Sequence, residues 1–139
     1  MPSRRPNAKV GCGVDVVELA RFRQAVARGG AAFLRRIFTA QEARYAKARK
    51  RTTMLHLAGR FAAKEAVIKA VSQVAPRRLL AMKHVEISND RLGRPHVTLR
   101  DGRRARPGSR QRRAGDRLQI HVSLSHVNSV AVASAIAIR

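Results

Sequence analysis

Near the N-terminus lies the segment Val10-Gly11-Cys12-Gly13-Val14-Asp15-Val16-Val17. Apolar residues alternate there with small or polar ones, which predicts a β-strand. Asp15 lies on the same face as Gly11 and Gly13, and glycines in a strand leave room for another group to approach closely. Burying a carboxylate is costly unless a cation pairs with it. The chain has 8 acidic residues against 30 basic ones, so a carboxylate in an apolar run is a candidate functional residue.

A second carboxylate of this kind, Glu65, lies in the segment Arg60-Phe61-Ala62-Ala63-Lys64-Glu65-Ala66. Apolar residues recur at helical spacing from about 53 to 73, which predicts a long helix that Pro76 stops. Glu65 is expected on or beside the packed face of this helix. If Asp15 and Glu65 came together, their oxygen atoms would suit a hard divalent metal.

The remaining sequence predicts helices followed by strands. Thr39 and Glu42 form a capping-box pattern at the start of a helix. The further predicted elements are a helix over about 18–29 ended by Gly29-Gly30, a short helical turn at 31–38, a helix from about 39 to 50, a hairpin over 83–99, a strand around 120–124 and a final strand at 130–138. This order indicates an α+β fold with a mainly antiparallel sheet packed with a long helix.

Length and charge bound the class of protein. The chain has 139 residues, enough for one domain with a real core, which we place at 10–139 after a basic flexible tail at 1–9. Residues 101–117 are rich in Arg and Gly and are expected to form an exposed basic loop. The formal net charge of +22 implies an acidic partner, which could be nucleic acid, an anionic membrane, an acidic protein or a polyphosphate ligand.

The compartment is constrained by what the sequence contains. Cys12 is the one cysteine, so an intrachain disulfide is excluded and a reducing compartment is favoured. We expect Cys12 to be a small buried residue. The sequence has no apolar run of transmembrane length, and its basic start is not followed by an apolar stretch as in a secretory signal. A cytoplasmic protein without a membrane partner is therefore expected.

Several blocks, taken together and in order, resemble the holo-acyl-carrier-protein synthase family of 4'-phosphopantetheinyl transferases. The blocks are Gly13 to Leu19, Phe33 to Thr39, Leu57 to Ala66 with Lys69-Ala70, Asn89-Asp90 with Leu92 to Pro95, and His121 to His126. The resemblance covers most of the chain. It implies transfer of the phosphopantetheine arm of coenzyme A to a serine of an apo acyl carrier protein, leaving adenosine 3',5'-bisphosphate. It also implies a cytoplasmic trimer with active sites at subunit interfaces.

The resemblance implies roles for individual residues. Asp15 and Glu65 would hold Mg²⁺ against the coenzyme A pyrophosphate, Glu65 directly or through a water would be the base, and Lys69 would lie near the phosphates. The implied contacts to coenzyme A are Arg60, Lys64, Lys69, Gly93, Arg94, Pro95, Ser125 and His126. Arg21 and Arg28, on the helix that docks the carrier's acidic helix, are the implied docking residues. The carrier could serve fatty acid biosynthesis, polyketide synthesis or another pathway.

The sequence departs from the family after Lys69. The family usually has a short Gly-Thr-Gly stretch there, whereas this chain has Val71-Ser72-Gln73-Val74-Ala75-Pro76. Backbone amides that would cradle a phosphate are therefore in question. The loop at 101–117 is also unusually basic compared with the family.

Other interpretations of the same residues stay open. Asp15 could be a helix cap or a salt-bridge partner, Glu65 could pair with Lys69 one helical turn away, and Glu18 could be either a further metal contact or a first-turn helix carboxylate. His126 could be a structural residue at a strand end, and His56, His84, His96 and His121 lack metal-like spacing.

Two other functions compete with the transferase. A nucleic-acid-binding module would explain the charge and the Arg-rich loop, but aromatic residues are 4% of the chain and the sequence carries no familiar binding motif. Nonspecific nucleic-acid binding by a basic enzyme is compatible with either function. A degenerate family member that docks carrier proteins without catalysis is the third hypothesis.

Overall fold

The structure is a computed structural model, and it describes residues 7–102 and 117–139. Most of the predicted tail, 1–6, and most of the predicted basic loop, 103–116, lie outside the described residues. Among the residues that are described, no helix is both long and apolar enough to cross a membrane.

The chain forms helices and strands in the predicted order. The helices are α1 (Leu19–Ile37), α2 (Ala40–Lys47) and α3 (Thr53–Val74), with short 3-10 helices η1 (Lys50–Thr52) and η2 (Met82–His84). The strands are β1 (Val10–Glu18), β2 (Val85–Asn89), β3 (Pro95–Leu99), β4 (Gln119–His126) and β5 (Val130–Ile138).

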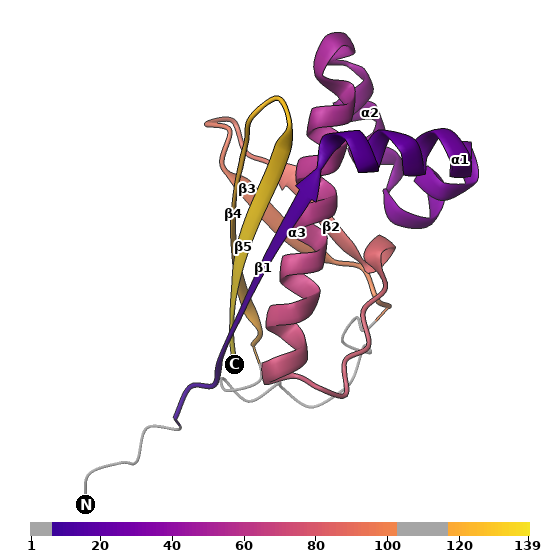
Figure 1. Cartoon of the computed structure of the whole chain (residues 1–139). Helices are drawn as coiled ribbons and strands as arrows, with labels where there is room; N and C mark the ends of the chain where they lie inside the picture. The colour runs from indigo at the N-terminus through magenta and orange to yellow at the C-terminus, as the bar shows by residue number, and fades with distance from the viewer. Residues whose placement is uncertain (1–6, 103–116) are drawn as a thin grey trace, which may run out of the picture.

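The strands form two antiparallel sheets around the long helix α3. One sheet has the order β1-β5-β4, and the other is the β2-β3 hairpin. Helix α3 packs along the three-stranded sheet and also contacts β2, α1 and α2, so it is the central element of the fold (Figure 1). The predicted α+β fold, with an antiparallel sheet packed with a long helix, is confirmed.

Small residues bring α3 unusually close to the sheet. A Cβ atom added to Gly13 would lie 2.0 Å from the Ala66 carbonyl oxygen, and one added to Gly11 would lie 2.2 Å from that of Ala70. Gly11 and Gly13 pair in register with Ala137 and Ala135 of β5, and the β5 alanines are all buried: Ala131, Ala133, Ala135 and Ala137. The group that the glycines admit is therefore the backbone of α3.

The opposite face of the sheet is exposed, and along β1 it is apolar. Val10, Val14 and Val16 are 64%, 59% and 60% exposed, and Ile136 on β5 is 46% exposed. Cys12 belongs to this face and is exposed, so the prediction that it is buried was wrong. The reason is that α3 covers the glycine face of β1, which leaves the valine side of the alternating pattern uncovered.

Helix α1 consists of two helical arms, which correspond to the predicted helix over about 18–29 and the predicted helical turn at 31–38. Gly30 has φ +57°, a conformation that favours glycine, and it separates the two arms, so the predicted end of the first helix at Gly29-Gly30 is confirmed. Phe22 from the first arm contacts Phe33 from the second, with ring centroids 6.5 Å apart, and also contacts Phe61 of α3 at 5.7 Å. These aromatic contacts hold the kinked helix against α3.

We predict that Gly13→Ala destabilises the protein by about 1–3 kcal/mol or more, because the new methyl group must push β1 away from the Ala66 carbonyl. Gly59→Ala is the matched control within α3, since its new Cβ would lie 4.0 Å from the nearest atom, in the Leu124 side chain. That control should be neutral or gain up to about 1 kcal/mol. Urea unfolding measures both, and equal stabilities of the two variants would contradict the close-packing interpretation.

Candidate active site

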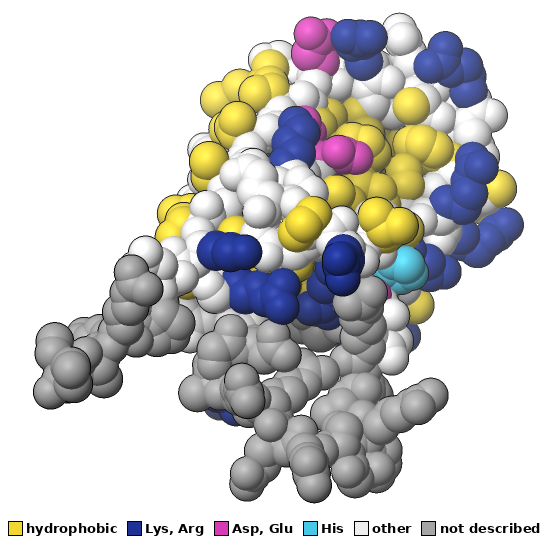
Figure 2. Space-filling view, turned by 90° about the horizontal axis from the view of Figure 1, so that it is seen from below, with side chains coloured by type: hydrophobic (Ala, Val, Ile, Leu, Met, Phe, Trp, Pro, Cys, Tyr) yellow, Lys and Arg dark blue, Asp and Glu magenta, His cyan; other side chains and the backbone are white. Residues whose placement is uncertain are grey.

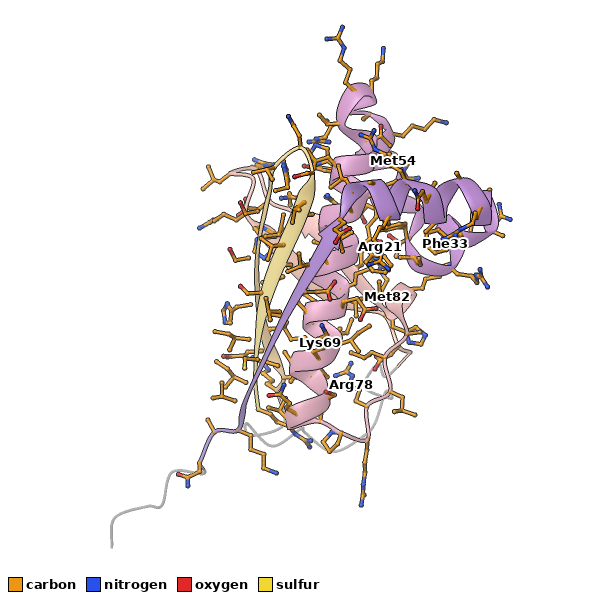
Figure 3. All side chains as sticks on the ribbon, viewed as in Figure 1. Arg21, Phe33, Met54, Lys69, Arg78 and Met82 are labelled. Atoms are coloured by element: carbon orange, nitrogen blue, oxygen red, sulfur yellow. The ribbon has the colours of Figure 1, made fainter. Side chains whose placement is uncertain are left out.

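Asp15 and Lys69 meet where β1 crosses α3. Lys69 Nζ donates to Asp15 Oδ1 at 3.0 Å and to the Val14 carbonyl at 2.9 Å. The Asp15 side chain is 19% exposed and that of Lys69 is 49% exposed. A half-exposed pair of this kind contributes at most about 1 kcal/mol, so the ammonium can turn to another anion at little cost. Figure 3 shows Lys69 on α3, on the side where β1 runs.

Glu65 lies one helical turn before Lys69 and directly before Ala66, the residue that packs against Gly13. It is partly buried and makes no hydrogen bond or ion pair to any residue that the structure describes. Glu18 is exposed at the end of β1 and, three positions from Asp15, lies on the opposite face of the strand. The carboxylates beside the close contact of β1 with α3 are therefore Asp15 and Glu65.

The donor set suits Mg²⁺ in part. Within 7–102 and 117–139, no group of three or more His, Cys, Asp or Glu residues is arranged to hold a metal. Mg²⁺ is nevertheless often bound through one or two carboxylates together with substrate phosphates and water. Asp15 and Glu65 match that pattern, with Lys69 as the neighbouring cation.

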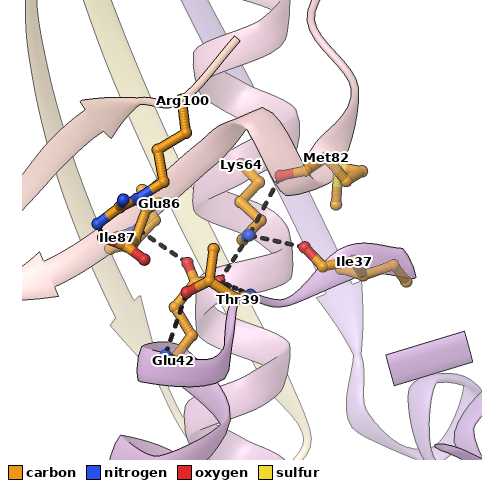
Figure 4. Close-up of polar contacts among 8 residues, drawn as sticks. All are labelled: Ile37, Thr39, Glu42, Lys64, Met82, Glu86, Ile87 and Arg100. Carbon is orange, nitrogen blue, oxygen red and sulfur yellow. Dashed lines mark hydrogen bonds and ion pairs between the residues drawn. The ribbon is translucent and has the colours of Figure 1, made fainter. Parts of the chain in front are cut away.

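Lys64 has a different role from the one predicted. Its side chain is fully buried and forms an ion pair with Glu42 at 2.7 Å. The ammonium also donates to the carbonyls of Ile37 and Met82, at 2.7 and 3.1 Å, so its three hydrogens are used inside the protein (Figure 4). Burial lowers the pKa of Lys64, and the Glu42 carboxylate opposes that shift. A buried and saturated lysine does not contact coenzyme A, so Lys64 is a structural residue.

The Lys64–Glu42 pair joins several elements. Glu42 completes the predicted capping box with Thr39 at the start of α2 and accepts a hydrogen bond from the backbone of Ile87 in β2. Lys64 also bonds to the end of α1, through the Ile37 carbonyl, and to η2, through the Met82 carbonyl (Figure 4). This network sets α1, α2 and β2 around the middle of α3.

We expect Lys64→Met to destabilise the protein by about 3–5 kcal/mol, because Glu42 would remain buried without its cation. Replacing Glu42 by Gln in the same chain removes the unpaired charge and should recover part of that loss. Thermal and urea unfolding of both variants provide the measurement. A single variant as stable as the wild-type protein would show that the pair does not hold these elements together.

A second set of polar and aromatic residues surrounds Tyr45 on α2. The guanidinium carbons of Arg49 and Arg60 lie 3.4 and 3.9 Å from the Tyr45 ring centroid, so they occupy opposite faces of the ring. The His56 ring packs nearly perpendicular to the Tyr45 ring, with centroids 5.7 Å apart. It packs in the same way on the His126 ring of β4, with centroids 6.0 Å apart. Burial lowers the pKa of His56, and the nearby positive charges of Arg49 and Arg60 lower it further.

This set extends to the turn between β2 and β3. Arg60 is 4% exposed, and its Nη2 donates to Asn89 Oδ1 at 2.9 Å. Asn89 in turn donates to the Gly93 carbonyl at 2.8 Å. The Nε of Arg60 is buried with no hydrogen-bond acceptor among the described residues. The structure thus joins His126, Arg60 and Gly93, which were all predicted to contact coenzyme A, through a continuous chain of contacts.

The other predicted residues lie at the surface. Gly93, Arg94, Ser125 and His126 are exposed, and Pro95 is partly buried at the start of β3. Arg21 and Arg28 are exposed on the first arm of α1, and Figure 3 shows Arg21 on that helix. Figure 2 shows acidic side chains beside a basic one, next to hydrophobic surface and with Lys and Arg around its margin. The Lys and Arg side chains around the margin of this face can therefore attract an acidic partner.

Sequence reasoning missed the residues that organise the second set. Tyr45 belongs to no sequence motif, and His56 was interpreted as a structural or surface residue because its spacing from other histidines does not suit a metal. Their contacts with Arg60 and His126 depend on how α2, α3 and β4 meet. The signal that was available was the sequence pairing of one tyrosine with several nearby arginines, which favours cation–π contacts.

The chain is similar in sequence to known proteins over most of its length. The sequence profile of the 4'-phosphopantetheinyl transferase superfamily matches residues 11–133. A holo-[acyl-carrier-protein] synthase of Geotalea daltonii is 39% identical over 123 residues, which are 88% of this chain and 93% of that protein. A synthase of the same name from Clostridium perfringens strain SM101 is 39% identical over 124 residues, covering 89% and 90%.

Solved structures show the same fold. The ACPS–CoA complex of Chronobacterium ammoniagenes has a TM-score of 0.72 and 28% identity, covering 93% of this chain and 96% of that one. The acyl carrier protein synthase of Mycobacterium tuberculosis has a TM-score of 0.63 and 33% identity, covering 91% and 95%. The resemblance stated from the sequence blocks is confirmed.

Proposed function

The chain belongs to the 4'-phosphopantetheinyl transferase superfamily, and we propose that it transfers the phosphopantetheine arm of coenzyme A to a serine of an apo acyl carrier protein. The observation that carries the proposal is the set of Asp15, Glu65 and Lys69 where β1 meets α3. Relatives that cover nearly the whole chain are named for this activity, and one solved neighbour is a complex with CoA.

The proposed chemistry follows from these three side chains. The serine Oγ attacks the β-phosphorus of coenzyme A, its proton passes to Glu65 directly or through a water, and the bond to the leaving adenosine 3',5'-bisphosphate breaks. Lys69 turns from Asp15 toward the phosphates and stabilises their charge. Mg²⁺ held by Asp15 and Glu65 would neutralise negative charge on the pyrophosphate.

The nucleotide of coenzyme A is proposed to lie over the second set of residues. Gly93, Arg94 and Pro95 supply the turn, while Ser125 and His126 supply the end of β4. Arg60 is buried beneath them and supports both sides through Tyr45 and Asn89. Arg60 and Lys69 are nine residues apart on α3, about 13 Å along the helix axis, so one extended ligand can use both sets.

The carrier is proposed to dock on α1. Arg21 and Arg28 lie seven positions apart on one side of the first arm, and both are exposed. An acidic carrier helix is the matching partner by charge, and charge complementarity of this kind speeds encounter. A carrier from fatty acid biosynthesis is the first one to test.

The exposed face of the sheet is proposed to be covered by further copies of the chain. Val10, Val14, Val16 and Ile136 form an apolar surface that a monomer would leave in water. A homotrimer with active sites at its subunit interfaces would bury this surface. The Arg-rich loop that favoured a nucleic-acid-binding module lies outside the described residues, and that hypothesis leaves Asp15 and Glu65 without a role.

We predict that Asp15→Ala and Glu65→Ala each reduce transfer by about 10²–10³-fold, because each removes a proposed Mg²⁺ ligand and Glu65→Ala also removes the proposed base. Intact carrier mass, measured over time with coenzyme A and Mg²⁺, gives the rate. Glu18→Ala is the matched control, since it removes a carboxylate from the exposed end of the same strand. Full activity of both site variants, with the fold retained, would contradict the assignment.

Assembly can be tested separately. Sedimentation equilibrium should give three times the 15.4 kDa chain mass, and Val14→Glu with Val16→Glu should shift the protein to smaller species. The charged pair would place carboxylates on the apolar face without disturbing α3, which packs on the other side of β1. A monomer at micromolar concentration for the wild-type protein would rule out the proposed trimer.

A further inference from the structure

Asn89 connects α3 to the turn between β2 and β3 with one side chain. Its Oδ1 accepts a hydrogen bond from Arg60 Nη2 at 2.9 Å, and its Nδ2 donates to the Gly93 carbonyl at 2.8 Å. An amide carries both an acceptor and donors, so it can satisfy a guanidinium on one side and a carbonyl on the other. A side chain with only one of these functions cannot make both bonds.

The turn that Asn89 bonds to is closed by hydrogen bonds of its own. Asp90 Oδ1 accepts hydrogen bonds from the backbone of Leu92 and Arg94, at 2.8 and 2.9 Å. The Asp90 and Arg94 backbones also bond to each other at 2.9 Å, and Gly93 adopts φ +79°. The bonds from Arg94 hold the pKa of Asp90 well below its usual range, so the carboxylate stays charged. Residues 90–94 therefore form a single turn closed by several hydrogen bonds.

The other end of the connection is equally fixed. Arg60 is buried, and its guanidinium packs on Tyr45, which also contacts Arg49 and His56. Rotation of the Arg60 side chain would break the stacking contact and leave more buried donors without acceptors. Asn89 therefore links two rigid units, and its length sets the distance between them.

We propose that Asn89 is a positioning residue for coenzyme A. The Asn89 side chain holds Gly93-Arg94-Pro95 at a fixed distance from Arg60 and His126. The proposal rests on the proposed function, because it assumes that Gly93-Arg94-Pro95 and His126 contact the nucleotide above the buried Arg60. Asn89 itself touches no reacting atom, and Asp15, Glu65 and Lys69 lie on other parts of the fold. Loss of Asn89 should therefore weaken the binding of coenzyme A and spare the transfer step once the enzyme is saturated.

The test compares Asn89→Ala with Ser88→Ala, its neighbour in β2. The Ser88 side chain makes no hydrogen bond to the described residues, so its truncation controls for general effects on the hairpin. Asn89→Ala should raise the KM for coenzyme A about tenfold, as expected for one well-formed hydrogen bond, with kcat within about threefold of wild type. Titration calorimetry with coenzyme A alone should show the same weakening.

A second variant distinguishes weaker binding of coenzyme A from a loss of folding. Asn89→Asp keeps an acceptor for Arg60 but faces the Gly93 carbonyl with a second acceptor, so it should stay folded and also bind coenzyme A more weakly. An unchanged KM and affinity in both Asn89 variants, or a fall in kcat alone, would overturn the proposal. A wild-type protein that neither binds coenzyme A nor modifies any carrier would instead overturn the proposed function.

Discussion

The close approach of α3 to β1 is the constraint on which the rest of the structure depends. Gly11 and Gly13 have no side chains to hold the helix away, and the alanines of β5 continue the same small surface. This packing places Asp15, the next residue on that face of β1, within reach of Lys69. A larger residue at Gly13 would separate the two elements that supply the charged groups, so the packing and the chemistry are not independent.

A second constraint keeps the surrounding helices in place. The buried Lys64–Glu42 pair binds the end of α1, the start of α2 and strand β2 to the centre of α3. Lys64 and Glu65 are adjacent in sequence but face opposite environments, one inside the protein and the other beside the site. Helix α3 therefore carries structural residues, the residues proposed for catalysis and the residue proposed to support the nucleotide on different sides. This explains why an otherwise apolar helix contains the charged residues Arg60, Lys64, Glu65 and Lys69.

Local patterns in the sequence predicted the elements well, and long-range contacts limited the prediction of the site. The Thr39–Glu42 capping box and the alternation in β1 depend on neighbours in the chain, and both are seen. Alternation cannot say which face of a strand is covered, and Cys12 was misplaced for that reason. Lys64 was assigned to coenzyme A through the family resemblance, and its true acceptors, Ile37 and Met82, could not be predicted because they are distant in sequence. The link from His126 to Asn89 also depends on tertiary packing.

The proposed arrangement transfers phosphopantetheine from coenzyme A with the help of a metal. This activity is measured by the intact mass of an apo acyl carrier protein after incubation with the wild-type chain, coenzyme A and Mg²⁺. We expect a gain of one phosphopantetheine group that disappears when EDTA removes the metal. A gain that persists in EDTA would contradict the metal assignment to Asp15 and Glu65. No gain on a panel of acidic carriers, from a protein that does bind coenzyme A, would contradict the transferase itself.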